Sequence, residues 1–257
     1  MGAIRGRWLA LVGYSIAMAY VESAAVLYLR TIIGGIDPVG PRQTPFNPVP
    51  DYGWIEIGRE AATILMLGTV GYLAGRGAAG RLGAFAVAMG VWDIFYYVFL
   101  WLFAGWPPSP LAQDILFLIP LPWWGPVLSP VLLALLMIAA GTAAMAREAG
   151  GELARPTARA WLLITGGAAL CLLAFMAHAL LALPRGIEAA YMVRGGPFPW
   201  PLYATGLVLM VAGLALALRR GGAFAELSGW HPSLGRHAGG RDSALLRRVG
   251  GGSDAGG

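Results

Sequence analysis

Six long apolar runs, each close to 20 residues, constrain the fold of this chain more than any other feature. A helix that crosses the roughly 30 Å apolar core of a bilayer needs about 20 residues, because each residue adds about 1.5 Å. The runs cover residues 8–29, 55–75, 82–104, 128–146, 160–183 and 201–218. Since 58% of the 257 residues are hydrophobic and only 12% are charged, polar side chains are too few to cover a soluble globule. The sequence therefore predicts an all-α, polytopic membrane protein with about six transmembrane helices.

The distribution of arginine predicts how these helices are oriented. The N-terminus and the links after the second, fourth and sixth runs hold 13 of the 18 basic residues, whereas the opposite side holds only Arg30, Arg42, Arg59, Arg185 and Arg194. Positively charged loops stay on the cytoplasmic side. We therefore expect a multi-pass protein of a bacterial-type plasma (inner) membrane, with both termini in the cytoplasm. The first run could instead be a signal peptide, but its length and Glu22 favour a retained helix.

The remaining segments divide into a bundle, a tail and one unusual outer link. We expect residues 1–220 to form the helical bundle, and the glycine-rich residues 221–257 to form a disordered cytoplasmic tail. The link between the third and fourth runs is rich in proline and contains one apolar piece, Leu111 to Ile119, which is too short to cross a bilayer. This piece is predicted to be a short helix on the outer side, either interfacial or re-entrant.

Acidic residues inside or near the apolar runs mark the candidate site. Helix rise places Glu22 about 12 Å, Asp93 about 16 Å, Glu60 about 8 Å and His178 about 9 Å below the outer surface. All lie in the outer half, and ionisable groups at such depth are costly and usually functional. We therefore expect one outward-facing polar pocket. Its candidate residues for binding a ligand or a proton are Asp93, Glu22, Glu60, Tyr96, Tyr97 and Glu56.

Each of these acids also has a structural interpretation. Glu22 or Glu60 could pair with Arg30 or Arg59 and lock two helices together. Asp93 is harder to explain in this way, because no arginine lies within two turns of it on its own helix, although a tyrosine could bond it. A hard metal ion is a further possibility, since carboxylates with one imidazole suit such ions. The metal set would then be Glu22, Glu60, Asp93 and His178.

Cofactor chemistry is bounded by the few cysteines and histidines. The single Cys171 excludes disulfides and iron–sulfur clusters within one chain, and only three histidines argue against haem held by paired histidines. Residues 75–80 match a dinucleotide-binding fingerprint, but they lie between two membrane runs, so we interpret them as a tight turn. Gly71 and Gly75 form a small-residue pair that favours close helix packing, within the chain or between two copies.

Three functions from different classes agree with these features. The first is ion binding and transport, in which the outer carboxylates carry a cation, a proton or a small solute. The second is a membrane-embedded enzyme that uses the carboxylates and His178, with or without a metal, on a lipophilic substrate. The third is a non-catalytic subunit of a larger membrane complex. Transport is our first expectation; membrane lipids are the expected partners, with a homo-oligomer or another membrane subunit possible and nucleic acid not expected.

Overall fold

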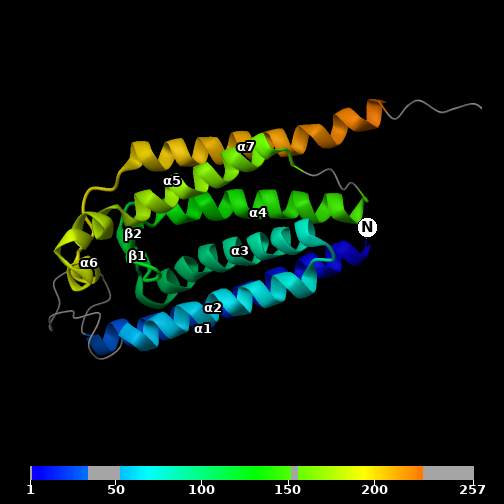
Figure 1. The fold of residues 1–257 in the computed structure, drawn as a ribbon. Coiled ribbons are helices and arrows are strands. Elements are labelled where there is room, and N and C mark those ends of the chain that lie inside the picture. Colours follow the sequence, from blue (N-terminus) through cyan, green and yellow to red (C-terminus); the bar gives the residue numbers. More distant parts are fainter. Residues whose placement is uncertain (1, 34–52, 152–155, 228–257) are drawn as a thin grey trace, which may run out of the picture. The chain divides into compact units, whose positions relative to one another are not determined.

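The computed structural model describes residues 2–33, 53–151 and 156–227. These residues form seven α-helices, one 3-10 turn and a two-stranded sheet (Figure 1). The elements are α1 (Gly2–Ile33), α2 (Gly53–Ala74), α3 (Ala78–Ala104), β1 (Gln113–Phe117), β2 (Trp123–Pro126), α4 (Leu128–Ala149), α5 (Ala158–Ala182), the 3-10 turn η1 (Leu183–Arg185), α6 (Ile187–Met192) and α7 (Trp200–Leu227). By its internal contacts the chain divides into Met1–Gly221, which contains the bundle, and Gly222–Gly257. Most of the predicted disordered tail, 228–257, lies outside the described residues.

The predicted all-α membrane fold is confirmed. Five helices in the described part of the chain, α1, α3, α4, α5 and α7, are long and apolar enough to cross a membrane. The remaining long helix, α2, has 22 residues but carries Glu56, Arg59 and Glu60 in its first two turns. It packs along α3 and α1, so all six predicted apolar runs form long helices (Figure 1).

Glycines allow these helices to approach closely. A Cβ atom at Gly83 of α3 would lie 2.8 Å from the Gly141 carbonyl oxygen of α4, and one at Gly90 would lie 2.6 Å from another α4 carbonyl oxygen. At Gly71 of α2, an added Cβ would meet the α3 backbone at 2.7 Å. Without a hydrophobic driving force in lipid, such close backbone packing is a main source of helix association. Gly71 therefore serves packing within the chain.

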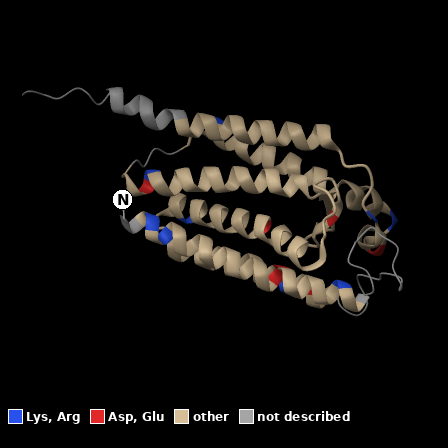
Figure 2. Cartoon of the chain, turned by 180° about the vertical axis from the view of Figure 1, so that it is seen from behind, with Lys and Arg blue, Asp and Glu red and all other residues tan. Residues whose placement is uncertain are grey.

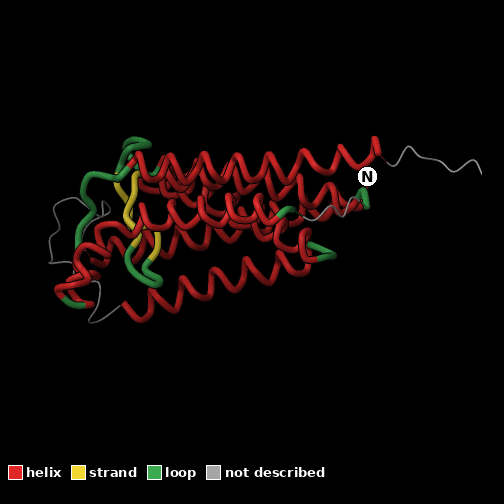
Figure 3. Tube along the Cα trace, turned by 45° about the horizontal axis from the view of Figure 1, so that its top comes forward, coloured by secondary structure: helices red, strands yellow, loops and turns green. Residues whose placement is uncertain are grey.

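The bundle has two distinct ends, which we name by the elements found there. The turn end contains the N-terminus and the tight connection between α2 and α3, and the hairpin end contains the strands and α6 (Figures 1 and 3). Helices α1 and α3 run toward the hairpin end, whereas α2 and α4 run away from it. Glu22, Glu60 and His178 lie in the halves of their helices that are nearer the hairpin end, and Asp93 lies near the middle of α3.

The prediction of a short helix over Leu111 to Ile119 is wrong. Residues Gln113–Phe117 form strand β1, which pairs antiparallel with β2 so that Asp114 faces Gly125. Prolines flank the apolar piece on both sides, and proline supplies no backbone N–H for a helix or ladder. The piece is therefore confined to one short strand, and its aromatic partners in β2 suit a sheet.

Candidate functional site

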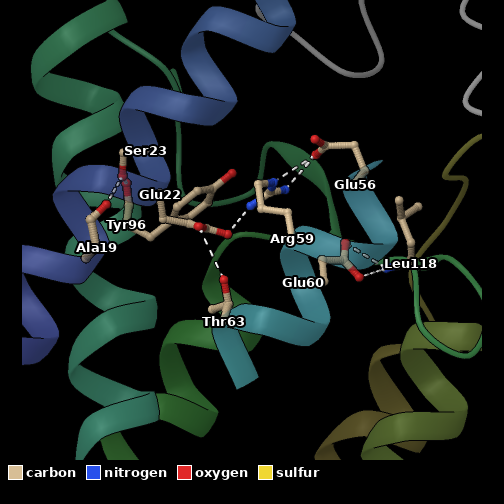
Figure 4. Close-up of polar contacts among 9 residues, drawn as sticks. All are labelled: Ala19, Glu22, Ser23, Glu56, Arg59, Glu60, Thr63, Tyr96 and Leu118. Atoms are coloured by element: carbon tan, nitrogen blue, oxygen red, sulfur yellow. Dashed lines mark hydrogen bonds and ion pairs between the residues drawn. The ribbon is translucent and has the colours of Figure 1, made fainter. Parts of the chain in front are cut away.

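The first polar group at the hairpin end joins α1 to α2 around Arg59. The Arg59 guanidinium forms an ion pair with Glu22 of α1, and it bonds Glu56 Oε2 through Nε at 3.0 Å and Nη2 at 2.7 Å. The Thr63 hydroxyl donates to Glu22 Oε2 at 3.3 Å. Glu22 is only 7% exposed, and Figure 4 shows both carboxylates directed at the one guanidinium. Glu22 and Glu56 thus share one cation, as the structural interpretation of Glu22 predicted.

Glu60, one helical turn after Glu56, fastens the hairpin to α2. Its two carboxyl oxygens accept from the Leu118 backbone N–H at 3.0 and 2.8 Å, just beyond the end of β1 (Figure 4). The Tyr191 hydroxyl of α6 lies 3.3 Å from the Leu118 carbonyl oxygen and 3.1 Å from the Pro120 carbonyl oxygen, and these two acceptors share its single proton. Burial and the nearby Glu60 carboxylate raise the pKa of Tyr191, which keeps its hydroxyl a donor. The backbone N–H and carbonyl groups just beyond the end of β1, which lie outside the two-stranded sheet, are therefore hydrogen-bonded by side chains.

A second ion pair holds β1 against α1 and α3. Arg30 Nη2 donates to Asp114 Oδ1 at 2.7 Å, and the Tyr97 hydroxyl lies 3.3 Å from Asp114 Oδ2. The Arg30 guanidinium also lies over the Trp106 ring, 4.4 Å from its centre. Asp114 is completely buried, so losing this cation would leave a charge in a low dielectric. Arg30 therefore binds Asp114 and not Glu22 or Glu60.

Asp93 differs from the other acids of the hairpin end. It lies on α3 one turn before Tyr97, and its Oδ2 atom is buried with no hydrogen-bond partner among the described residues. Asp93 acts electrostatically on Asp114, Tyr97 and Tyr203 of α7. Its surroundings are therefore the region between α3, the hairpin and α7, whereas Glu22 and Glu60 have partners on α2 and the hairpin.

Tyr96 joins the first polar group to α3 through its backbone. The Ser23 hydroxyl lies 2.7 Å from the Ala19 carbonyl oxygen of its own helix and 2.9 Å from the Tyr96 carbonyl oxygen (Figure 4). The Tyr96 ring packs against Trp92 and Tyr97. Of the six predicted site residues, the structure thus brings Glu22 and Glu56 together on Arg59 and places Tyr96 beside them. Glu60, Tyr97 and Asp93 have separate partners or none.

The predicted metal set is not assembled. Within 2–33, 53–151 and 156–227, no three histidine, cysteine, aspartate or glutamate side chains come together as metal ligands. The physical reason is that Glu22 is occupied by Arg59 and Glu60 by the Leu118 amide. His178 instead packs against the chain before α7, since a Cβ atom at Gly196 would lie 2.8 Å from its Nε2.

The turn that resembles a dinucleotide fingerprint binds a carboxylate of the protein itself. Glu148, in the last turn of α4, accepts from the backbone N–H groups of Gly77 and Arg76, the latter at 3.1 Å. Gly77 is the residue before α3 and has no side chain with which to cap the helix. Glu148 therefore takes the place that a phosphate takes in a dinucleotide-binding turn.

Sequence reasoning missed the contacts of the hairpin. Asp114 and Leu118 both lie in the piece for which the sequence predicts a short interfacial or re-entrant helix. One signal could have indicated the buried pair: Asp114 is the only charged residue inside an otherwise apolar piece. A charge at such a position needs a partner.

Comparisons with known family models, curated proteins and solved structures find no match for this chain. Its function must therefore be inferred from the residues at the hairpin end.

Proposed function

We propose that this protein is a membrane transporter in which the Asp93 carboxyl reversibly binds a proton or a small cation. The observation that carries this proposal is the contrast among the acids at the hairpin end. Glu22, Glu60 and Asp114 each have a cation or a backbone N–H as partner, whereas Asp93 Oδ2 has no hydrogen-bond partner in the described part of the chain. A carboxyl inside an apolar helix whose Oδ2 atom forms no hydrogen bond in the described part of the chain is a candidate for exchange.

The charges support an outward-facing hairpin end, as the arginine distribution predicted. Figure 2 shows several basic positions at the end of the bundle that carries the N-terminus. Two arginines at the opposite end, Arg30 and Arg59, are matched by Asp114 and by Glu22 with Glu56. Segments rich in arginine stay on the cytoplasmic side, so we assign the turn end to the cytoplasm and the hairpin end to the outside. On this assignment Asp93 receives its ion from outside the cell.

The test is ion flux in liposomes that contain the purified protein. Wild type, Asp93→Asn and Glu60→Gln would be reconstituted at equal density, and internal pH and sodium would be followed with dyes after imposing a pH or sodium gradient. Asn keeps the size of Asp93 but cannot exchange a proton, so its flux should fall at least tenfold. Glu60→Gln is the matched control, because Gln retains an oxygen that accepts from Leu118.

A second measurement detects exchange at Asp93 directly. Dicyclohexylcarbodiimide forms a stable adduct with protonated carboxyls in apolar surroundings, and mass spectrometry of peptides locates it. We expect the adduct on Asp93 and not on Glu22, which is paired with Arg59. If wild type shows no flux of either ion above empty liposomes, or if Asp93→Asn transports as fast as wild type, the proposal is wrong.

A further inference from the structure

A long groove opens on the surface of the bundle between α3 and α4 at the hairpin end. It has a volume of about 630 Å³. Its α3 wall contains Ile94, Val98 and Trp101, its α4 wall contains Leu128 and Val131, and residues 107–110 close its outer end. Its lining includes no charged residue among those that the structure describes. Its size falls in the range of about 300–1,000 Å³ that is typical of sites for small molecules.

The shape of the groove matches the direction of a hydrocarbon chain in a bilayer. Ile94, Val98 and Trp101 follow one another at intervals of four and three residues, so they share one face of α3 and extend about 10 Å along its axis. Val98 is 39% and Trp101 59% exposed, which leaves the wall open to the surrounding lipid. Because α3 is long and apolar enough to cross a membrane, a groove along it would run in the same direction as the acyl chains.

The outer end of the groove is rigid. Three prolines, at 107, 108 and 110, fix their own backbone angles, and only Ser109 separates them. This segment is bonded to the start of α4, because Leu128 N donates to the Pro110 carbonyl oxygen at 2.8 Å. A turn within the segment is closed by Ala112 N, which donates to the Ser109 carbonyl oxygen at 3.0 Å. A preformed apolar groove loses little entropy when a chain enters it, and therefore binds more tightly than an adaptable surface.

We infer that this groove holds one acyl chain of a phospholipid from the outer leaflet. The headgroup lies beyond the proline segment, near the exposed Trp101, since tryptophan favours the level of the lipid headgroups. The acyl chain lies against Ile94 and Val131 toward the bilayer centre. This site does not include Asp93, so it is independent of the proposed transport function.

The experiment measures phospholipid that remains bound after stringent detergent washing. Full-length protein would be purified from membranes, washed in a detergent that removes loosely bound lipid, and analysed by native mass spectrometry in the presence of added phosphatidylglycerol or phosphatidylethanolamine. Val98→Trp fills the groove from an exposed position. Leu102→Trp is the matched control, since Leu102 is 60% exposed on the same helix but does not line the groove.

We expect wild type and Leu102→Trp to retain one phospholipid per chain, and Val98→Trp to retain at least tenfold less at the same lipid concentration. A melting curve for each variant separates loss of lipid from loss of fold. Asp93→Asn should retain as much phospholipid as wild type, whether or not it transports ions. The lipid inference and the transport proposal can therefore be refuted independently of each other. The inference is overturned if wild type retains no phospholipid, or if Val98→Trp, folded, retains as much as wild type.

Discussion

Replacing Glu60 by alanine should loosen the hairpin and destabilise the bundle by about 2–4 kcal/mol. Glu60 is 7% exposed, and both of its oxygens accept from the buried Leu118 N–H. Leaving that N–H without a partner costs about 1–3 kcal/mol. Losing the one buried methylene that Ala lacks adds about 0.8 kcal/mol. The free energy of unfolding would be measured by titrating sodium dodecyl sulfate into mixed micelles and following helical circular dichroism.

Hydrogen exchange identifies where the stability is lost. In Glu60→Ala, peptides that contain Leu118 should exchange faster, whereas peptides from the middle of α4 should keep their wild-type rates. Glu60→Gln keeps an accepting oxygen and should lose less than about 1 kcal/mol. Thr69→Ala removes only an exposed hydroxyl that bonds within α2, and should change little. The reasoning fails if Glu60→Ala stays within about 0.5 kcal/mol of wild type, the range of neutral surface substitutions.

Two further substitutions test other contacts of the fold. Glu148→Ala removes the carboxylate that caps α3 at Gly77, and should cost about 1–2 kcal/mol in the same titration, with Glu148→Gln losing less. Equal stability of all three proteins would contradict the capping role. Tyr191→Phe removes a donor to two hairpin carbonyls and should cost less than about 1 kcal/mol at neutral pH. Because burial raises the pKa of Tyr191 above its usual 10.0, its contribution is full below pH 10.0 and is lost as the pH rises through the raised pKa. The gap between wild type and Tyr191→Phe should therefore close at alkaline pH, and a gap that stays constant would show that the hydroxyl does not titrate as inferred.

The long helices could be predicted because lipid imposes a simple rule on the sequence. Every backbone polar group in a bilayer core must bond internally, so an apolar run of about 20 residues has few alternatives to a helix. The run at 55–75 forms α2 despite its three charges because Glu56, Arg59 and Glu60 all find partners at the hairpin end. The Gly71 packing was predictable for a similar reason, since small residues permit close helix contact.

The hairpin and the division of the site could not be predicted in the same way. An apolar piece of nine residues is short enough for either a strand or a buried helical turn, and only its pairing with Trp123 and Trp124 decides between them. Likewise, the sequence offered Arg30 and Arg59 equally to Glu22 and Glu60. The choice depends on which helix faces lie together, which is a property of the packed bundle and not of any one helix.

The hairpin contacts α1 and α2 on one side and α5 on the other through different kinds of interaction. This difference indicates which contacts would separate first. Toward α1 and α2 it is held by Asp114 with Arg30 and by the Leu118 amide with Glu60. Toward α5 it is held by stacking of Trp123 on Phe175, with ring centres 6.1 Å apart and planes 2° from parallel. Hydrogen bonds to charged groups contribute about 1.5–3 kcal/mol each and an aromatic pair about 0.5–1.5 kcal/mol.

The contacts toward α5 and α6, which also include the Tyr191 hydroxyl with the Leu118 and Pro120 carbonyl oxygens, involve no charged group in the described part of the chain. Under the proposed transport function, we expect these contacts to separate first, while the hairpin stays with α1, α2 and α3. Asp93 belongs to α3, and its Oδ2 atom takes no part in the hydrogen bonds and ion pairs that hold the hairpin to α1 and α2. An ion could then reach Asp93 without breaking either buried ion pair. Under the proposed transport function, the acids other than Asp93 could therefore remain committed to structure while Asp93 exchanges its ion.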